Sequence, residues 1–338
     1  MSSKITFVMM ESIYPQRGGV HEQVYLILRE LKRMKIDGNI VSYSTRSAGE
    51  KGKKFLWLRQ NSPFFIRKIV KSGGDVLVSE TAWPIIPTLT ASKIMGNRCI
   101  VHLHSVESKQ DVGLSIGGKG IISILERFER FCNVILVPSK IEKELLSNIS
   151  SSRIEVMQNV IDVEGFKKYQ PVNLMKPSVV FVGGMGYPPN REAAERIIRI
   201  SDIIRRRGVL VNFYLVGPSP PPVTPPVYST GYVESTIPYI LGSDICIAPI
   251  LRGGGVKLKV LEYMASGKPI IASKKAVEGI DEIEYIHAEK DEEFAENIIQ
   301  IVKGKMEISK FARNKELTIK NHSPENAVNV LLKTIKYG

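Results

Sequence analysis

The chain has 338 residues, a length that suggests two domains. Hydrophobic residues make up 43% of it and charged residues 24%, proportions that exclude a largely disordered protein. Lysine and arginine exceed aspartate and glutamate by 47 to 34, so the formal net charge is +13 and anionic partners have to be considered.

In the first half of the chain, short apolar runs alternate with longer amphipathic ones. The apolar runs predict strands at residues 5–10, 39–43, 76–78, 99–103 and 134–137. The amphipathic runs predict helices at residues 20–34, 120–131 and 139–147. Ser139 is a suitable N-cap because Glu142 follows three residues later. Alternation of this kind predicts βαβ units around a parallel sheet.

The same alternation restarts after a linker at residues 172–177. Strands are expected at 178–182, 210–216, 245–249 and 269–272, and helices at 190–206, 256–266, 292–302, 308–319 and 324–335. We therefore predict an α/β fold with two Rossmann-like, doubly wound domains, residues 1–170 and 171–322, followed by a helix within 323–338. Ligands of such sheets bind at the C-terminal ends of the strands, so the site is expected in a central cleft that both domains face.

One segment, Lys51–Lys71, concentrates the basic charge. It has seven basic residues and no acidic ones, with four aromatic rings interleaved: Phe55, Trp57, Phe64 and Phe65. This mixture is typical of a segment that contacts an anionic membrane surface. Two other interpretations stay open at this stage: binding to nucleic acid, which is the less favoured partner, and a solvated basic face whose rings belong to the core.

The cysteines and the N-terminus bear on the compartment. Cys99, Cys132 and Cys246 are scattered without a CxxC pair, which disfavours a zinc ribbon or a disulfide framework and favours a reducing compartment. No apolar run approaches the roughly 20 residues that span a bilayer. The N-terminus lacks a signal-peptide layout and leads directly into a strand. We expect a cytoplasmic protein, peripheral at the inner membrane face if Lys51–Lys71 contacts lipid.

Two glycine-rich loops are candidate anion sites. Gly18 and Gly19 follow the first expected strand and open a helix, although a structural turn explains this pair equally well. The dinucleotide fingerprint GxGxxG is absent there, which counts against a dehydrogenase. The second loop, Gly253–Gly255, has three consecutive glycines whose backbone is able to wrap an anion at a helix N-terminus.

Two lysines follow the second loop. Lys257 and Lys259 fall where a helix dipole disfavours cations, which suggests that they serve a ligand. Lys259 and Glu262 are three residues apart and share a helix face. A lysine near a diphosphate and a glutamate that accepts hydroxyl hydrogen bonds would bind a nucleotide sugar. An ordinary Lys–Glu surface pair explains these two residues, but not the triple glycine.

Two histidines, His102 and His104, alternate at the end of an expected strand, with Glu107 nearby. This spacing invites a metal interpretation, but the sequence offers no clear third or fourth ligand, and we expect no metal site. We favour a functional role for His104, because parallel sheets place their site residues at this end of a strand.

Taken together, these motifs resemble those of the family-4-like group of GT-B glycosyltransferases (glycosyltransferase group 1). The most specific match is Lys257–Ile271, which is similar to the family's "KxxEAMAxGxPVV" block. Weaker matches, in the family's order along the chain, are Gly18–Val20, His104–Glu107, Val137–Ser139, Val156–Asp162, Phe181–Asn190, Gly231–Val233 and Glu278–Gly279.

The resemblance implies a retaining, metal-independent transferase that takes sugar from a nucleotide-diphosphate sugar to a glycan, lipid or protein. It implies donor contacts by Gly18, Gly19, Gly253, Gly254, Gly255, Glu262, Tyr232 and Val233, with His104, Lys257 and Lys259 at the reacting groups. It needs no cofactor besides the donor substrate. It also implies that the helix within 323–338 crosses back to the first domain.

The chain departs from the family pattern at two places. Many members carry a glutamate eight residues before Glu262, where this chain has Gly254, and they carry Arg and Lys in the loop that here reads Met185–Asn190. The lost cations would leave diphosphate neutralisation to Lys257, Lys259 and the glycine loop. These departures keep other interpretations open: a catalytically silent scaffold or binding protein of the same fold, and a nucleotide-sugar epimerase. A sugar phosphorylase would normally have a much longer chain.

Overall fold

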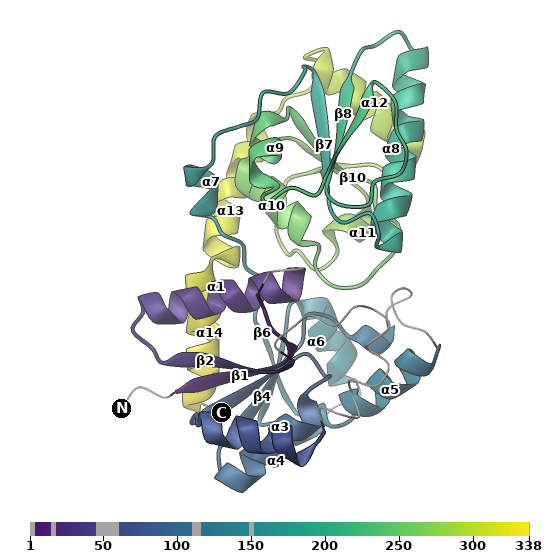
Figure 1. The fold of residues 1–338 in the computed structure, drawn as a ribbon. Helices are drawn as coiled ribbons and strands as arrows, with labels where there is room; N and C mark the ends of the chain where they lie inside the picture. The colour runs from purple at the N-terminus through teal and green to yellow at the C-terminus, as the bar shows by residue number, and fades with distance from the viewer. Residues whose placement is uncertain (1–3, 15–17, 45–60, 110–115, 149–151, 338) are drawn as a thin grey trace. The chain divides into compact units, whose positions relative to one another are not determined.

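The computed structural model describes residues 4–14, 18–44, 61–109, 116–148 and 152–337. The described chain forms two compact units (Figure 1). Unit 1 contains the residues up to Val160, together with the segment that begins at Pro324, and unit 2 contains Ile161–Ser323. Among the described residues, the chain passes from unit 1 to unit 2 after Val160, ten residues before the predicted boundary, and returns to unit 1 after Ser323.

Unit 1 is a parallel six-stranded sheet with the order β2-β1-β3-β4-β5-β6. Its strands are β1 (Ile5–Glu11), β2 (Gly38–Ser44), β3 (Val76–Glu80), β4 (Arg98–His102), β5 (Val134–Val137) and β6 (Arg153–Val156). Its helices are α1 (Gly19–Arg33), α3 (Pro63–Ser72), α4 (Ile85–Met95), α5 (Ile116–Glu126), α6 (Lys140–Ser147) and α14 (Pro324–Tyr337), with 3-10 turns η2 (Glu107–Lys109) and η3 (Glu129–Phe131).

The C-terminal helix α14 belongs to unit 1. Its apolar residues Ala327, Val328 and Leu331 share one core cluster with Val24 and Ile27 of α1. Figure 1 shows α14 alongside α1, at the opposite end of the colour scale. The chain therefore returns to its first unit after completing the second.

Unit 2 is a second parallel six-stranded sheet, with the order β12-β11-β10-β7-β8-β9. Its strands are β7 (Ser178–Val182), β8 (Asn212–Val216), β9 (Val227–Gly231), β10 (Ile245–Ala248), β11 (Ile270–Ala272) and β12 (Ile286–His287). Its helices are α7 (Gly165–Lys168), α8 (Pro188–Arg206), α9 (Ile237–Gly242), α10 (Leu258–Ser266), α11 (Lys274–Val277), α12 (Asp291–Val302) and α13 (Arg313–His322), with the 3-10 turn η4 (Ser309–Ala312).

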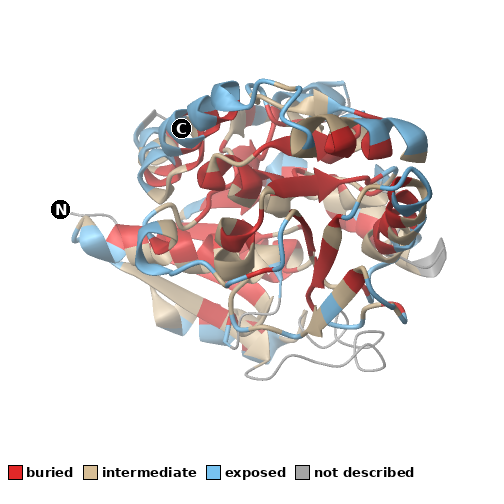
Figure 2. Ribbon diagram, turned by 90° about the horizontal axis from the view of Figure 1, so that it is seen from above, coloured by how far each residue is buried: buried red, intermediate tan, exposed pale blue. Residues whose placement is uncertain are grey.

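Burial explains why the strands read as continuous apolar runs. All four residues of β5, and all four of β10, are buried, because helices cover both faces of each sheet. Figure 2 shows the buried positions, in red, following the strands and the inner faces of the helices. Ser139 caps α6 as predicted, its hydroxyl oxygen accepting a hydrogen bond from the backbone N–H of Glu142.

Two of the predicted helices are each divided between an α-helix and a 3-10 turn. The helix expected at 120–131 ends at Glu126 and is followed by η3, and the helix expected at 308–319 is η4 followed by α13. None of the helices in the described ranges is long and apolar enough to cross a membrane. Within Lys51–Lys71, residues 51–60 lie outside the described part of the chain, and α3 contains most of the remainder.

Candidate functional site

The strand order of unit 2 creates a switch point between β7 and β10. From β7 the chain proceeds outward through β8 and β9, and then continues on the other side of β7 with β10, β11 and β12. The loops after β7 and β10 therefore leave the sheet in opposite directions. Ligands of doubly wound sheets bind in the crevice that such diverging loops create.

The first of these loops begins with Gly183, a position where a side chain would crowd two polar groups. Its φ is +147°, and a Cβ there would lie 2.7 Å from Nζ of Lys259 and 3.0 Å from Nδ2 of Asn190. Asn190 in the first turn of α8 holds the loop, because its amide donates to the carbonyl of Gly184 at 2.9 Å. Gly183 thus leaves room for Lys259 and Asn190 to meet.

Lys259 is a strongly perturbed cation of unit 2. Its ammonium donates to Oδ1 of Asn190 at 2.6 Å and lies 4.1 Å from the ring centroid of Phe181. Burial lowers the pKa of Lys259 to about 7, an effect that Glu262 opposes and Lys257 reinforces. A lysine held in this way is stabilised as a cation by any anion that approaches it.

The loop after β10 contains the three glycines. Gly253 has φ +100° and Gly255 has φ +68°, conformations that favour glycine. Nζ of Lys257 donates to the carbonyl oxygens of Gly253, Gly254 and Gly255, at 3.3, 3.2 and 2.6 Å. Lys257 occupies the N-cap position of α10, which begins at Leu258, two residues after the predicted start at Val256. The loop therefore wraps the ammonium of Lys257 in this structure.

Glu262 and the loop after β9 complete the predicted donor residues of unit 2. Glu262 is half-buried on α10, with its carboxylate 3.4 and 3.5 Å from the hydroxyl of Thr236. Tyr232 follows β9 with 76% of its surface exposed, whereas Val233 packs against the core of unit 2. The exposed ring of Tyr232 is accessible to a ligand.

Unit 1 contains the other predicted site residues. Gly18 is the N-cap of α1 and Gly19 its first residue, with the carbonyl of Gly18 accepting from the N–H of Glu22 at 3.2 Å. The glycine pair therefore opens a helix, as expected, at the C-terminal side of β1.

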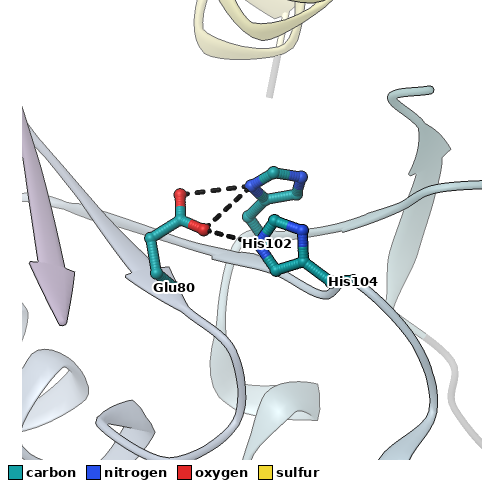
Figure 3. Close-up of side chains that lie close together, drawn as sticks. All are labelled: Glu80, His102 and His104. Carbon is teal, nitrogen blue, oxygen red and sulfur yellow. Dashed lines mark hydrogen bonds and ion pairs between the residues drawn. The ribbon is translucent and has the colours of Figure 1, made fainter. Parts of the chain in front are cut away.

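His104 lies two residues beyond β4 and belongs to a buried cluster with Glu80 and His102 (Figure 3). Glu80 ends β3 and is the register partner of His102 at the end of β4. Nδ1 of His102 is 3.1 Å from each carboxylate oxygen of Glu80, and Nε2 of His104 is 2.9 Å from Oε2. The side chain of Glu80 is fully buried.

The charges of this cluster are strongly perturbed. Burial alone would raise the pKa of Glu80, but the histidines, and His102 above all, outweigh burial and lower this pKa to about 2. Burial, reinforced by His102, lowers the pKa of His104 despite the attraction of Glu80. The carboxylate is therefore ionised and His104 is neutral at physiological pH.

Glu107, which the sequence associated with the histidines, has a different partner. Its carboxylate accepts a hydrogen bond from the indole Nε1 of Trp83 at 2.9 Å. The carboxylate that accompanies the histidines is Glu80, which sequence reasoning missed. Among the described residues, Glu80, His102 and His104 form the one group with the ligand types and spacing to hold a metal ion.

Two family models match the sequence in succession. "Glycosyltransferase Family 4" matches residues 17–164, and "Glycosyl transferases group 1" matches residues 176–304. The chain belongs to this glycosyltransferase family. A search of curated proteins gave no match.

Solved structures support the same fold. Sucrose-phosphate synthase (tll1590) from Thermosynechococcus elongatus is 16% identical with a TM-score of 0.78, over 98% of each chain. A glycosyltransferase from Rickettsia africae ESF-5 is 15% identical with a TM-score of 0.73, over the whole of both chains. Anabaena Alr3699/HepE, in complex with UDP and glucose, is 14% identical with a TM-score of 0.69, over 98% of this chain and 99% of that one. The prediction of two Rossmann-like domains of the GT-B type is confirmed, as is that of a glycosyltransferase.

Proposed function

We propose that this glycosyltransferase takes its sugar from a nucleotide-diphosphate sugar. The bond between the anomeric carbon and the diphosphate oxygen breaks, and the nucleoside diphosphate leaves with the bonding electron pair. A bond from the anomeric carbon to an acceptor oxygen forms, and the proton of the acceptor hydroxyl passes to the leaving diphosphate or to solvent. A relative of the same fold was solved with UDP and glucose, which supports a donor of this class. The acceptor we propose is a hydroxyl of a glycan, lipid or protein, with retention at the anomeric carbon and no metal at the diphosphate.

Lys259 is the observation that carries this proposal. It is a cation with a pKa of about 7, at the switch point of the sheet, whose hydrogen-bond partner is a neutral amide. A leaving diphosphate gains negative charge as the glycosidic bond breaks, and a pre-placed cation in a buried site stabilises that charge. This is the property that the reaction requires of the donor site.

The other predicted residues have complementary roles in this proposal. Lys257 would exchange the glycine-loop carbonyls for phosphate oxygens, and the N-terminus of α10 would add its partial positive charge. Glu262 would accept hydrogen bonds from the ribose hydroxyls, with Tyr232 and Val233 beside the base. In unit 1, Gly18 and Gly19 would approach the diphosphate and His104 the sugar.

Nucleotide binding tests the proposal directly. Thermal-shift and calorimetric titrations with UDP, GDP, ADP and TDP, without added metal, should identify one nucleotide that stabilises the wild type. At a concentration of 100 Kd the expected gain is about 2.7 kcal/mol. Glu262→Ala should abolish this gain, whereas Glu292→Ala, an exposed glutamate of α12 in the same unit, should retain it.

The remaining outcomes separate the alternatives. A folded wild type that responds to none of the four nucleotides would favour a silent binding protein of the same fold. A nucleotide sugar that is isomerised without an acceptor, and without release of the nucleoside diphosphate, would favour an epimerase.

Contact with an anionic membrane is proposed for unit 1. The helix α3 exposes Phe64, Arg67, Lys68 and Lys71 while it buries Phe65 and Ile69. Residues at positions 64, 67, 68 and 71 share one side of a helix, so an aromatic ring and three cations are presented together. This arrangement supports peripheral attachment of a cytoplasmic protein to anionic lipid.

A further inference from the structure

Glu80, His102 and His104 form the Glu80 cluster of unit 1, which has an unusual distribution of hydrogen-bond donors and acceptors (Figure 3). An ionised carboxylate only accepts hydrogen bonds. The two nitrogens that face Glu80, Nδ1 of His102 and Nε2 of His104, must therefore carry the protons. Each imidazole is thereby oriented by the same buried carboxylate.

The proton on Nε2 of His104 determines the state of its other nitrogen. Because His104 is neutral, Nδ1 carries a lone pair and is an acceptor. This Nδ1 is buried and has no hydrogen-bond partner. An unsatisfied buried acceptor is costly for a folded protein, and one in a candidate site calls for a ligand that donates to it.

The backbone also positions the carboxylate of Glu80. Glu80 and His102 are paired across β3 and β4, and the next backbone N–H, that of Thr81, donates to the carbonyl of His102 at 2.9 Å. Thr81 adopts φ +70°, a conformation that β-branched residues rarely take. The strand thus ends in a constrained turn, with Glu80 directed at the histidines.

We propose that Glu80 is a positioning residue that holds His104 as its Nε2-protonated tautomer, so that Nδ1 accepts a hydrogen bond from a hydroxyl group of the carbohydrate substrate. This inference rests on the proposed function of the protein. His102 completes the arrangement by contacting both carboxylate oxygens, so that Glu80 keeps its charge while fully buried. A neutral amide in place of Glu80 would orient the imidazole without imposing one tautomer.

The same three side chains are also able to ligate a divalent cation. In that case Nδ1 of His102 and Nε2 of His104 would both be unprotonated, because a metal takes the lone pair. The unsatisfied Nδ1 of His104 favours the tautomer explanation. A metal bound at Nε2 would leave Nδ1 of His104 without a hydrogen-bond partner.

The first test is the tautomer itself, in the full-length wild type. Nitrogen-15 NMR of labelled histidine, with the signals of His104 assigned through His104→Asn, should show a protonated Nε2 and an unprotonated Nδ1. Glu80→Gln should give a mixture of tautomers. A protonated Nδ1 in the wild type would overturn the proposal, as would stoichiometric metal in the purified wild type that disappears in Glu80→Gln.

The second test is kinetic and uses the donor identified by the nucleotide screen. Glu80→Gln should lower kcat at least tenfold while the Kd of the nucleoside diphosphate changes less than twofold. Glu80→Asp, which keeps the charge, should recover part of the lost kcat. Glu30→Gln is the matched control, a buried glutamate of the same unit that lies outside the cluster and is ion-paired with Arg33, and it should leave kcat unchanged.

The outcomes distinguish this inference from the proposed function. An unchanged kcat in Glu80→Gln would reject the positioning role and leave the donor assignment intact. A wild type that binds no nucleotide, yet shows the expected tautomer, would reject the donor assignment while Glu80 still fixes His104. If Glu80→Gln does not fold, the wild-type NMR measurement decides alone.

Discussion

The hydroxyl of Tyr263 accepts a hydrogen bond from the backbone N–H of Val182 at 3.0 Å, at the point where β7 and β10 separate. Val182 still pairs with Val216 of β8, but the register between β7 and β10 ends at Val180 and Cys246, so the N–H of Val182 has no partner on β10. The fully buried ring of Tyr263 enters from α10 and takes the place of that strand. The helix that carries Lys259 and Glu262 is thereby fixed to the switch point.

Tyr263→Phe should therefore weaken unit 2 without changing its core volume. The N–H of Val182 would be left buried without a partner, which costs about 1–3 kcal/mol. Denaturant unfolding of the variant and the wild type measures this difference. Tyr232→Phe, which alters a mostly exposed ring of the same unit, is the control and should be neutral. A Tyr263→Phe protein as stable as the wild type would show that this hydrogen bond does not anchor α10.

Gly183→Ala tests whether the close approach of Lys259 and Asn190 matters for donor binding. The new Cβ would lie 2.7 Å from Nζ of Lys259, so the ammonium has to move. We expect the affinity for the nucleoside diphosphate to fall at least tenfold in calorimetry. Gly186→Ala is matched within the same loop, because a Cβ there meets its nearest atoms at 3.7 Å, and it should bind normally. Equal affinities of the two variants would argue against a donor role for Lys259.

The sheets and the glycine loop were predictable because they depend on local patterns. Residues 134–137 and 178–182 read as strands since every side chain in them is apolar or small and buried. The prediction at residues 76–78 stopped two residues short, because Ser79 and Glu80 end the apolar run although both are buried. Glu80 was therefore not recognised as a candidate site residue. Its pairing with His102 depends on the register between β3 and β4, which cannot be read from the sequence.

The hydrogen-bond partners of Lys257 and Lys259 could not be predicted from the sequence either. Lys257 and Lys259 are two residues apart, yet one ammonium meets loop carbonyls and the other meets Asn190. The difference follows from the start of α10 at Leu258, which turns the two side chains in different directions. The strand β9 was missed because Tyr228, Ser229 and Thr230 are partly exposed at the edge of the sheet and form no apolar run.

The lowered pKa of Lys259 predicts a pH dependence of nucleotide binding. At pH 8 the side chain is roughly nine-tenths neutral for a pKa of about 7, and a bound diphosphate would restore its proton. Calorimetry at pH 8 in two buffers of different ionisation enthalpy should show uptake of about one proton, and at pH 6 almost none. The affinity should fall as the pH rises through 7. In Lys259→Met the uptake should vanish, and its persistence would assign the proton to another group.

The lowered pKa of Lys259 also predicts that the free energy of unfolding of the ligand-free protein depends on pH. The unfolded chain holds the proton of Lys259 more tightly than the folded protein does between pH 7 and the ordinary lysine pKa of 10.5. The cost of burying the ammonium is thus fully present below pH 7 and declines as the pH rises. Lys259→Met should remove this cost, so its gain in the free energy of unfolding should be larger at pH 6.5 than at pH 9.5. A pH-independent difference between the two proteins would contradict the shift.

The exposed face of α3 predicts that the protein binds anionic lipid. Phe64 is 84% exposed and is flanked along the helix by Arg67, Lys68 and Lys71. Each basic residue near an anionic surface contributes about 1 kcal/mol, so Arg67→Glu should lower vesicle partitioning at least fivefold. Phe64→Ser should lower it through the lost ring, whereas Leu210→Ser, a similarly exposed residue of unit 2, should not. Co-sedimentation with phosphatidylcholine vesicles, with and without phosphatidylserine, measures all three. Equal sedimentation with both vesicle types would reject an electrostatic contact, because neutral lipid offers no charge to the lysines and the arginine.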